Sequence, residues 1–391
     1  MSLGYFDRRG MRMRKALFVA TVVKTHIMEF HIPYLKLFKE MGWETAVAAR
    51  NDYENADDCV IPYCDTYYNI PFERSPLKPG NFKAYRELKR VIDAGGYDII
   101  HCHTPVGAML TRLAAKKARK RGTKVLYTAH GFHFYTGAPA VNWLVYYPVE
   151  RWLARYTDVL ITINQEDYAR AQSFKAKNVC YVPGVGVDLN KFNVGCVDRT
   201  AKREEIGIAQ DEFALLSVGE LIPRKNHEVV LRALAVLKQA EELDGIQYVI
   251  CGRGALEQEL KSLTAELGLT EQVHFLGYRK DIPAICAACD LFVFMSHQEG
   301  LPVALMEAMA CGLPVVCSAI RGNTDLFETG VTGLLAEKTP QGVAAAIQIM
   351  RENPELREQA AAAARKKVRE FDLDVVRARM KEIYEAAGAA E

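Results

Sequence analysis

Short apolar segments of strand length alternate with segments of helical spacing along almost the whole chain. In the first half, this pattern predicts strands at 15–22, 44–50, 97–103, 124–130, 158–164 and 178–184. Apolar positions spaced for a helix lie between them, at about 27–41, 81–94, 106–121 and 142–156, and from Glu166 onward. The stretch between the second and third strands holds Pro71, Pro76 and Pro79 and is expected to be a loop. Such alternation is typical of an α/β protein with an open parallel sheet and helices on both faces.

The alternation stops once, around residues 184–203, and then starts again. Strands are expected at 213–219, 246–252, 272–277, 290–295 and 313–319, with helices between them and up to the end of the chain. A chain of 391 residues is too long for one hydrophobic core. We therefore expect two doubly wound, Rossmann-like domains, at 12–190 and 205–372, with a last helix, 373–391, that packs back on the first. Two such domains facing one another would form a cleft at the carboxyl ends of their strands.

The cysteine content and the absence of long apolar runs indicate in which cellular compartment the chain is expected. Ten cysteines without a signal peptide indicate free thiols in a reducing cytoplasm. No apolar run reaches the roughly 18 to 20 residues needed to cross a bilayer. Basic residues are in excess in the first half and acidic residues in the second. Either one half faces an anionic partner, or the charges are scattered between two domains, and both interpretations remain open.

One stretch, residues 294–317, places two carboxylates around the start of a helix. Glu299 lies in a polar loop after an apolar strand, and Glu307 lies inside the helix, which has Pro302 in its first turn. Eight residues of helix span roughly 12 Å, which is too far for two carboxylates to share one proton or one metal ion. The positive end of a helix attracts phosphate. The stretch therefore predicts a ligand along the helix start, with one end held by each acid.

A second loop carries two adjacent cations. A strand ends at Gly219, Asn226 is expected to cap the following helix, and Arg224 and Lys225 lie between them. Cations at the carboxyl end of a strand are placed to neutralise a diphosphate leaving group. A solvated basic pair is the alternative.

Two further segments follow strands in the same half. Gly252-Arg253-Gly254 opens a helix and would allow a close backbone approach to a ligand, although no third glycine completes a dinucleotide fingerprint. Tyr278 and Arg279 stand at the next strand end, where Asp281 is expected to cap a helix.

Four segments in this order, GEL-x3-K-x-H, CGRG, LGYRKDIP and HQEGLPVALMEAMACGLPVV, resemble the donor-binding domain of glycosyltransferase family 4. The E-x7-E pair, Glu299 and Glu307, is the most specific part of the resemblance. It covers the chain from about Lys15 and is firmest between 217 and 335. It implies the GT-B fold and a retaining hexosyl- or N-acetylhexosaminyltransferase that uses a nucleoside-diphosphate sugar, expected to be UDP-linked. It also implies that the enzyme needs no metal and no other cofactor.

The resemblance also implies roles for single residues. Glu307 would hold the ribose, Glu299 would bind hydroxyls of the donor sugar, and Lys225 would stabilise the departing diphosphate. The remaining donor-binding residues would line the sugar, phosphate and base: Gly219, Arg224, Gly252, Arg279, Gly300 and Leu301. No side chain is an obvious nucleophile, and the resemblance implies that the leaving phosphate oxygen would take the proton of the acceptor on the same face of the sugar.

One position departs from the family. An arginine commonly follows the strand-ending glycine, and here that position is Glu220. Only Lys225 matches the usual arginine–lysine pair. Our hypothesis is that Arg224 supplies the second positive charge from the neighbouring position.

Histidines follow two strands of the first half. His130 matches the histidine that the family sets against the donor sugar, and we place it with Lys225 and Glu299 in the catalytic set. A core histidine with a backbone partner is the alternative for His130. His103 and His133 are expected on the acceptor side. Together with His101 they show no recognised zinc spacing, so we expect no metal site.

The first half also combines basic and aromatic residues. Seven basic residues between Arg112 and Lys124 are expected around one helix, and an aromatic-rich region, 132–156, follows. This combination suits a peripheral protein resting on anionic lipid at the inner face of the membrane, or a solvated helix beside a packed one; both remain open. Similar enzymes that build bacterial capsule or exopolysaccharide use a glycan or polyprenyl-diphosphate-linked acceptor. No nucleic-acid motif accompanies the charges.

Two other candidate sites have simpler explanations. Cys286-x2-Cys289 has no second pair at ligand spacing and is expected to be two buried thiols, and Asp372 is expected to cap a helix. A nucleotide-sugar epimerase or phosphorylase on the same fold, and a non-catalytic sugar-nucleotide-binding protein, are the alternative functions.

Overall fold

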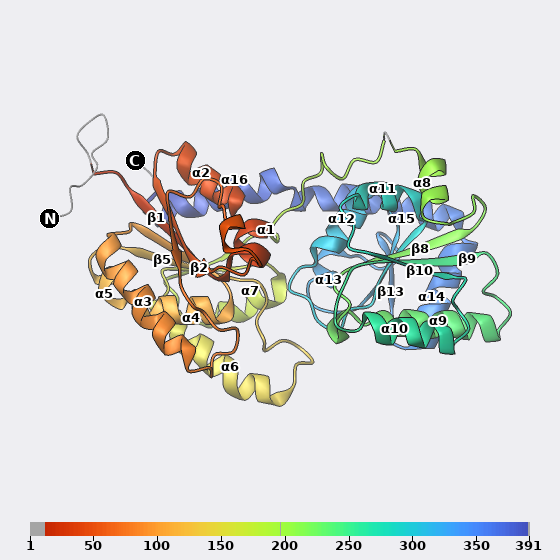
Figure 1. Cartoon of the computed structure of the whole chain (residues 1–391), viewed down its shortest axis with the longest axis horizontal. Coiled ribbons are helices and arrows are strands. Elements are labelled where there is room, and N and C mark those ends of the chain that lie inside the picture. Colours follow the sequence, from red (N-terminus) through yellow and green to blue (C-terminus); the bar gives the residue numbers. More distant parts are fainter. Residues whose placement is uncertain (1–11, 196, 390–391) are drawn as a thin grey trace. The chain divides into compact units, whose positions relative to one another are not determined.

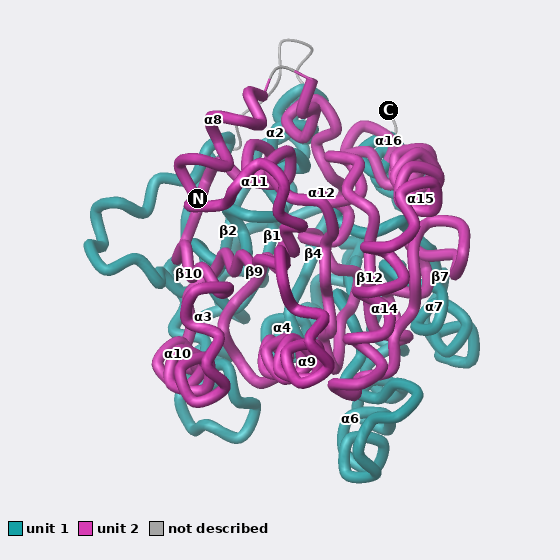
Figure 2. Tube along the Cα trace, turned by 90° about the vertical axis from the view of Figure 1, so that its right-hand side faces the viewer, with its two compact units in different colours: residues 1–185, 376–391 teal, residues 186–375 magenta. Residues whose placement is uncertain are grey.

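A computed structural model describes residues 12–195 and 197–389 and divides the chain into two compact units (Figures 1 and 2). Unit 1 comprises residues 1–185 and 376–391, and unit 2 comprises residues 186–375. The division falls at the start of the stretch expected to be a linker. Most of that stretch lies in unit 2, because Asp198 caps a helix, Arg199–Glu205, whose Arg199 binds Asp290 at 2.7 Å.

The sheet of unit 1 has seven parallel strands. In spatial order they are β3 (Thr66–Asn69), β2 (Glu44–Arg50), β1 (Lys15–Val22), β4 (Ile99–Cys102), β5 (Lys124–Ala129), β6 (Val159–Thr162) and β7 (Asn178–Tyr181). Its helices are α1 (Met28–Phe30), α2 (Ile32–Glu40), α3 (Gly80–Gly95), α4 (Pro105–Ala114), α5 (Lys116–Lys120), α6 (Ala140–Leu153), α7 (Gln165–Ala171) and most of α16 (Leu373–Tyr384).

The sheet of unit 2 has six parallel strands. In spatial order they are β10 (Val273–Gly277), β9 (Ile246–Cys251), β8 (Phe213–Val218), β11 (Leu291–Phe294), β12 (Val315–Ser318) and β13 (Gly333–Ala336). Its helices are α8 (Arg199–Glu205), α9 (His227–Gln239), α10 (Glu257–Glu266), α11 (Ile282–Ala288), α12 (Val303–Cys311), α13 (Asn323–Leu326), α14 (Pro340–Glu352) and α15 (Pro354–Lys367).

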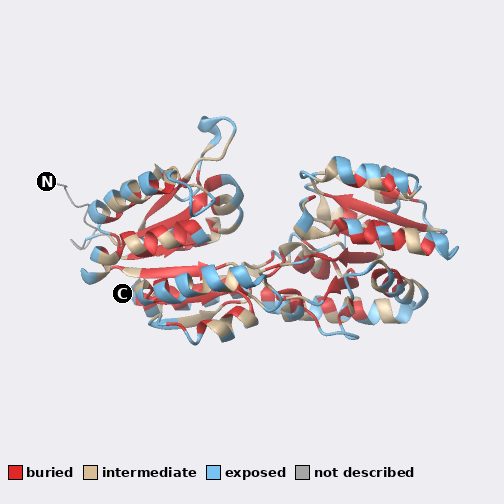
Figure 3. Cartoon of the chain, turned by 90° about the horizontal axis from the view of Figure 1, so that it is seen from below, coloured by how far each residue is buried: buried red, intermediate tan, exposed pale blue. Residues whose placement is uncertain are grey.

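The central strands of both sheets are buried on two faces and are red in Figure 3, whereas the edge strands β3, β7 and β10 are only partly buried. This burial explains why most strands read as continuous apolar runs. The sequence patterns missed two strands, β3 and β13. Each has only four residues and lies at the edge of its sheet, where one neighbour suffices and little apolar periodicity is needed.

The last helix, α16, returns to unit 1. Its Val376, Met380 and Ile383 are buried in the same core as β1 and α2, and its Tyr384 is fully buried. Asp372 accepts a hydrogen bond from the amide of Asp374 at 2.9 Å, as expected of a residue that caps this helix. Among the described residues, no helix is long and apolar enough to span a bilayer.

Candidate functional site

Each sheet has one point where the strand order reverses. It lies between β1 and β4 in unit 1, and between β8 and β11 in unit 2. Ligands of open α/β sheets bind outside the carboxyl ends of the strands at such a point, because neighbouring connections leave on opposite faces and open a crevice. In unit 2, Lys225 follows β8 and Glu299 follows β11. In unit 1, His103 follows β4.

Glu299 is held by two cations from the loop after β8. Nζ of Lys225 donates to Oε1 at 2.8 Å, and Arg224 donates to Oε2 at 3.0 Å. Glu299 is only 8% exposed. Two cations and one carboxylate leave an excess positive charge, which favours an anionic ligand. The carboxylate has about four lone-pair sites, and two remain available for hydroxyl donors.

The backbone around these residues is fixed from both sides. Arg224 also donates to the carbonyl of Gln298 at 2.9 Å, and Arg321 donates to the carbonyl of Glu299 at 3.1 Å. Asn226 has a left-handed backbone with φ 54°, and no capping hydrogen bond. The prediction that it stands at the N-cap position of α9 is confirmed, but its side chain does not make the cap. Its side-chain amide donates instead to the carbonyl of Met295 at 3.2 Å, and so joins the loops after β8 and β11.

The glycines of this region let two loops pack backbone against backbone. A Cβ added to Gly252 would lie 1.8 Å from the carbonyl oxygen of Gly219, and one added to Gly254 would lie 2.4 Å from that of Leu221. The amide of Gly219 donates to Cys251, within the same contact. The close approach that these glycines permit in the structure is therefore between two protein loops.

Helix α12 begins at Val303, four residues after Glu299. Pro302 is its N-cap, one position before the helix and not in its first turn, and Glu307 is half-buried in its second turn. Within the described part of the chain, the amides of Gly300 and Leu301 donate to no protein acceptor. Two such amides at a helix start can bind phosphate or sugar oxygens.

Arg279 is engaged in an ion-pair network. It donates to Asp281 at 2.7 Å and to Glu205 of α8. Asp281 is the N-cap residue of α11, as predicted, but its side chain makes no capping hydrogen bond. Its pKa is lowered, mainly by the hydrogen bonds from Arg279, and it also pairs with Lys202 at 3.0 Å. The side chain of Arg279 therefore fastens α8 to the start of α11.

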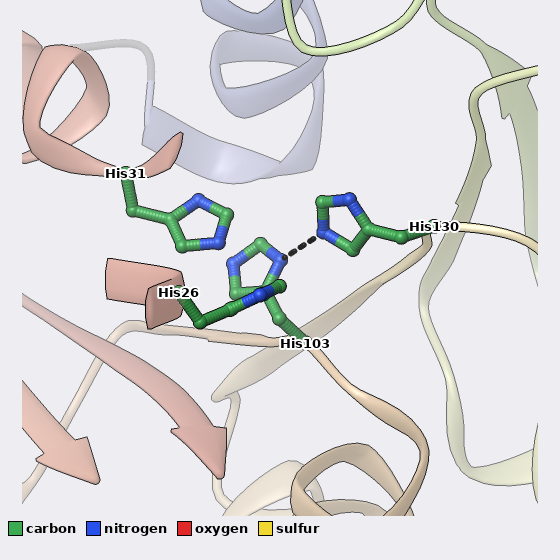
Figure 4. A group of neighbouring side chains, drawn as sticks. All are labelled: His26, His31, His103 and His130. Carbon is green, nitrogen blue, oxygen red and sulfur yellow. Dashed lines mark hydrogen bonds between the residues drawn. The ribbon is translucent and has the colours of Figure 1, made fainter. Parts of the chain in front are cut away.

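Four histidines gather at the reversal point of unit 1. His26 lies in a π-helical segment after β1, His31 lies between α1 and α2, His103 follows β4 and His130 follows β5 (Figure 4). Nε2 of His130 lies 3.4 Å from Nδ1 of His103, and the rings of His31 and His103 stack at 3.7 Å between centroids.

Burial keeps these imidazoles neutral at pH 7. It lowers the pKa of His130 to about 4. The pKa values of His26, His31 and His103 lie well below 6.5, first through burial and then through neighbouring histidines. Sequence spacing missed this cluster because its members come from separate loops, and His26 and His31 carried no signal of their own.

The other two histidines of the first half lie outside this cluster. His101 is inside β4 and binds Tyr384 and Thr128, each at 2.8 Å, which makes it a core residue. The ring of His133 packs against that of Tyr146 of α6 at a tilt of 32°, and His133 lines a cavity of about 490 Å³. That cavity lies in unit 1 and is mostly apolar and aromatic, with Leu77, Met109 and Phe132 among its lining residues.

The basic helix predicted around Arg112–Lys124 is two helices, α4 and α5, and not all of its charges face solvent. Arg112 is completely buried, pairs with both oxygens of Glu150 at 2.8 and 3.1 Å, and lies over the ring of Tyr127. Arg119 pairs with Asp158 at 2.8 Å. Lys117 and Lys120 are exposed.

Cys286 and Cys289 are buried free thiols, as predicted.

Two family models match the chain. The model of glycosyl transferases group 1 matches residues 198–367, and that of a glycosyl transferase 4-like domain matches residues 34–184. A Bacillus subtilis (strain 168) protein that carries the glycosyltransferase name EpsD is 44% identical over 325 residues, which are 82% of this chain and 83% of that protein. The Escherichia coli UDP-Gal:alpha-D-GlcNAc-diphosphoundecaprenol alpha-1,3-galactosyltransferase is 32% identical over 262 residues, 66% of this chain and 67% of that one.

Solved structures agree in fold. HepE of Anabaena, crystallised with UDP and glucose, is 22% identical and superposes with a TM-score of 0.77 over 95% of this chain and 100% of that one. WaaG, a glycosyltransferase involved in lipopolysaccharide biosynthesis, is 18% identical with a TM-score of 0.73, over 94% of this chain and 99% of that one. The predicted two-domain GT-B architecture is confirmed.

Proposed function

This chain belongs to the glycosyl transferases group 1 and is a GT-B glycosyltransferase; from that premise we propose that it moves a sugar from a UDP-sugar to a lipid-diphosphate-linked acceptor, with retention at the anomeric carbon. The product would be an intermediate in the synthesis of a bacterial surface polysaccharide. The observation that carries the proposal is the pairing of Glu299 with both Lys225 and Arg224 at the reversal point of unit 2.

The loop after β8 would bind the diphosphate. Lys225 and Arg224 concentrate positive charge beside the amides of Gly300 and Leu301, and charge-assisted hydrogen bonds to phosphate are among the strongest available to a protein. As the bond to the sugar breaks, negative charge grows on the leaving phosphate, and a cation already in place stabilises it without reorganisation. Gly219 and Gly252 would keep this loop close to its neighbour.

The two carboxylates would bind the two ends of the donor. Glu299 would accept hydrogen bonds from hydroxyls of the sugar, and Glu307, further along α12, would accept them from the ribose. The segment at Arg279 would border the base through its backbone, since its side chain is engaged with Asp281 and Glu205. In unit 1, His130 would be neutral and would donate or accept a hydrogen bond at the sugar.

The acceptor side would be unit 1. The Escherichia coli relative is named for an acceptor on diphosphoundecaprenol. The 490 Å³ cavity beside His133 offers apolar and aromatic walls to such a lipid or its first sugar. His103 would lie on the same side.

Helix α6 would rest on the membrane. Leu153 is its only buried residue, while five large apolar residues are more than a third exposed: Val141, Leu144, Val145, Val149 and Trp152. Nζ of Lys116 lies 5.3 Å from the ring centre of Trp152. An apolar helix face next to lysines suits a surface of anionic lipid.

A transfer assay tests the proposal. UDP-glucose, UDP-galactose and UDP-N-acetylglucosamine would each be incubated with a monosaccharide on a polyprenyl diphosphate, and the product anomer read by NMR. We expect one donor to give a product of retained configuration. An inverted product, cleavage of the donor only with inorganic phosphate, conversion of the donor to its epimer, or donor binding without transfer to any lipid acceptor would overturn it.

Vesicle flotation tests the membrane contact separately. The double variant Leu144→Ser/Val145→Ser should lose most binding to vesicles that contain anionic lipid. Val60→Ser is the matched control, since Val60 is 72% exposed elsewhere in unit 1. Equal flotation of the double variant and of Val60→Ser would show that α6 does not contact the membrane.

A further inference from the structure

The four imidazoles of unit 1 converge, although the hydrogen bond between His130 and His103 joins only two of them. One nitrogen from each of His26, His31, His103 and His130 lies within 4.8 Å of the other three (Figure 4). The group contains no carboxylate among the described residues. His31 and His103 are each 1% exposed, whereas His26 and His130 are half-buried.

Several of these nitrogens are buried without a partner. Within the described part of the chain, both ring nitrogens of His31, and Nε2 of His26 and of His103, make no hydrogen bond. A buried polar atom without a partner destabilises the folded state, so three such side chains together are a feature that needs a reason. Neutral imidazoles, as found here, present the lone pairs that a metal ion requires.

All four nitrogens lie within 4.8 Å of one another, and one pair already has the spacing of a tetrahedral site. Zinc–nitrogen bonds of about 2.0–2.1 Å place the ligand atoms of a tetrahedron about 3.3 Å apart. Nε2 of His130 and Nδ1 of His103 are already 3.4 Å apart. A cavity of about 10 Å³, which borders His31, His103 and His130 but not His26, has room for a single atom.

We propose that His26, His31, His103 and His130 form a binding site for one divalent transition-metal ion of the zinc class. Four neutral nitrogen ligands suit zinc, cobalt, nickel or copper, and they do not suit magnesium or calcium, which prefer oxygen. The half-buried His26 and His130 give the ion a route from solvent.

The metal ion would bind reversibly at this site. In structural zinc sites the outer nitrogen of each histidine donates to a carboxylate or a carbonyl, and loss of such a partner weakens affinity about 10–100-fold. The unpartnered nitrogens of His31 show that such support is absent. The ion would also occupy the ring nitrogen of His130. If His130 acts at the donor sugar, a step that rests on the proposed function, bound metal inhibits transfer reversibly.

Binding is measured with Zn²⁺ and Co²⁺ alone, on protein free of any polyhistidine tag. We expect one ion per chain by calorimetry, a Co²⁺ absorption spectrum typical of tetrahedral coordination, and a rise in Tm. His26→Ala and His31→Ala should each weaken binding at least about tenfold. His274→Ala is the control, because His274 is also half-buried but lies in unit 2 and binds Gln247 at 2.8 Å.

Circular dichroism without metal shows whether each variant is folded. Because His31 is buried, His31→Ala could lower binding through a packing defect, and His26→Ala, at the more exposed position, tests the site without that defect. No stoichiometric binding, or equal binding by both variants and the parent, would overturn the site. Transfer is then compared with and without Zn²⁺ as a ratio for each variant. Inhibition of the parent and of His274→Ala, and not of His26→Ala, is expected. Stoichiometric binding without inhibition would leave the metal site standing and refute its link to His130.

Discussion

Nζ of Lys225 lies 2.8 Å from Oε1 of Glu299, although 74 positions separate the two residues in the sequence. The contact exists because β8 and β11 are neighbours in the sheet, so that the loops after them meet at its carboxyl edge. Arg224 binds the other oxygen of the same carboxylate. We propose that Arg224 thus supplies the positive charge of the arginine that the family has where this chain has Glu220.

Replacement of Lys225 by alanine should lower kcat about 100-fold or more, because the charge of the leaving diphosphate would lose its nearest cation. The measurement is the initial rate of transfer at saturating donor. Lys261→Ala serves as the control, since Lys261 is exposed and pairs with Glu257 on its own helix. A Lys225→Ala variant with unchanged kcat would exclude the role.

Arg224→Ala should reduce kcat/KM about tenfold, less than the loss of Lys225, because the side chain of Arg224 is 39% exposed and partly screened by solvent. Glu220→Ala should behave as the parent, since a carboxylate cannot stabilise a leaving diphosphate. If Arg224→Ala left turnover unchanged while Glu220→Ala abolished it, the idea that Arg224 supplies the missing charge would be wrong.

Glu307→Gln should weaken UDP binding about tenfold or more while kcat at saturating donor stays close to that of the parent. The reason is that a hydrogen bond to a charged group contributes roughly 1.5–3 kcal/mol, and this one would form equally in the ground and transition states. Calorimetry with UDP gives the affinity. Intact affinity with an abolished chemical step would assign Glu307 to the reaction itself.

Breaking the buried pair of Arg112 and Glu150 should destabilise unit 1. Arg112→Met leaves Glu150 without its partner and should cost about 3–5 kcal/mol, whereas Arg112→Met/Glu150→Leu should recover much of that loss. The three tryptophans, Trp43, Trp143 and Trp152, all lie in unit 1, so fluorescence during urea unfolding reports on that unit. Equal midpoints for the single and double variants would contradict the prediction.

Gly252→Ala should lower the stability of unit 2 and the affinity for UDP together. The new Cβ would meet the carbonyl oxygen of Gly219, which belongs to the backbone and cannot move aside alone. Gly195→Ala is the control in the same unit, because its Cβ would lie 3.3 Å from the side chain of Asn193, which can move. Circular dichroism measures the stability, and normal UDP binding by Gly252→Ala would show that the loop contact is dispensable.

The repeated alternation of strands and helices was enough to predict two doubly wound units, because a strand buried on both faces must be a continuous apolar run. The same periodicity could not locate β3 and β13, since a four-residue strand at a sheet edge needs few apolar positions. Nor could it assign roles to Asn226 and Asp281: the residue type fits a helix cap, and each side chain has a better partner from a distant segment.

The sequence alone determined which chemical groups the candidate site of unit 2 contains. The positions of Lys225 and Glu299 after strands, and of Glu307 inside a helix, follow from the residues around each of them. Tertiary structure decided which groups meet. Only sheet topology places Arg224 on Glu299, buries Arg112 against Glu150, and brings His26 and His31 to His103. Local sequence patterns predict whether a segment is a strand or a helix. Contacts between loops depend on the order of the strands in the sheet, which local patterns do not predict.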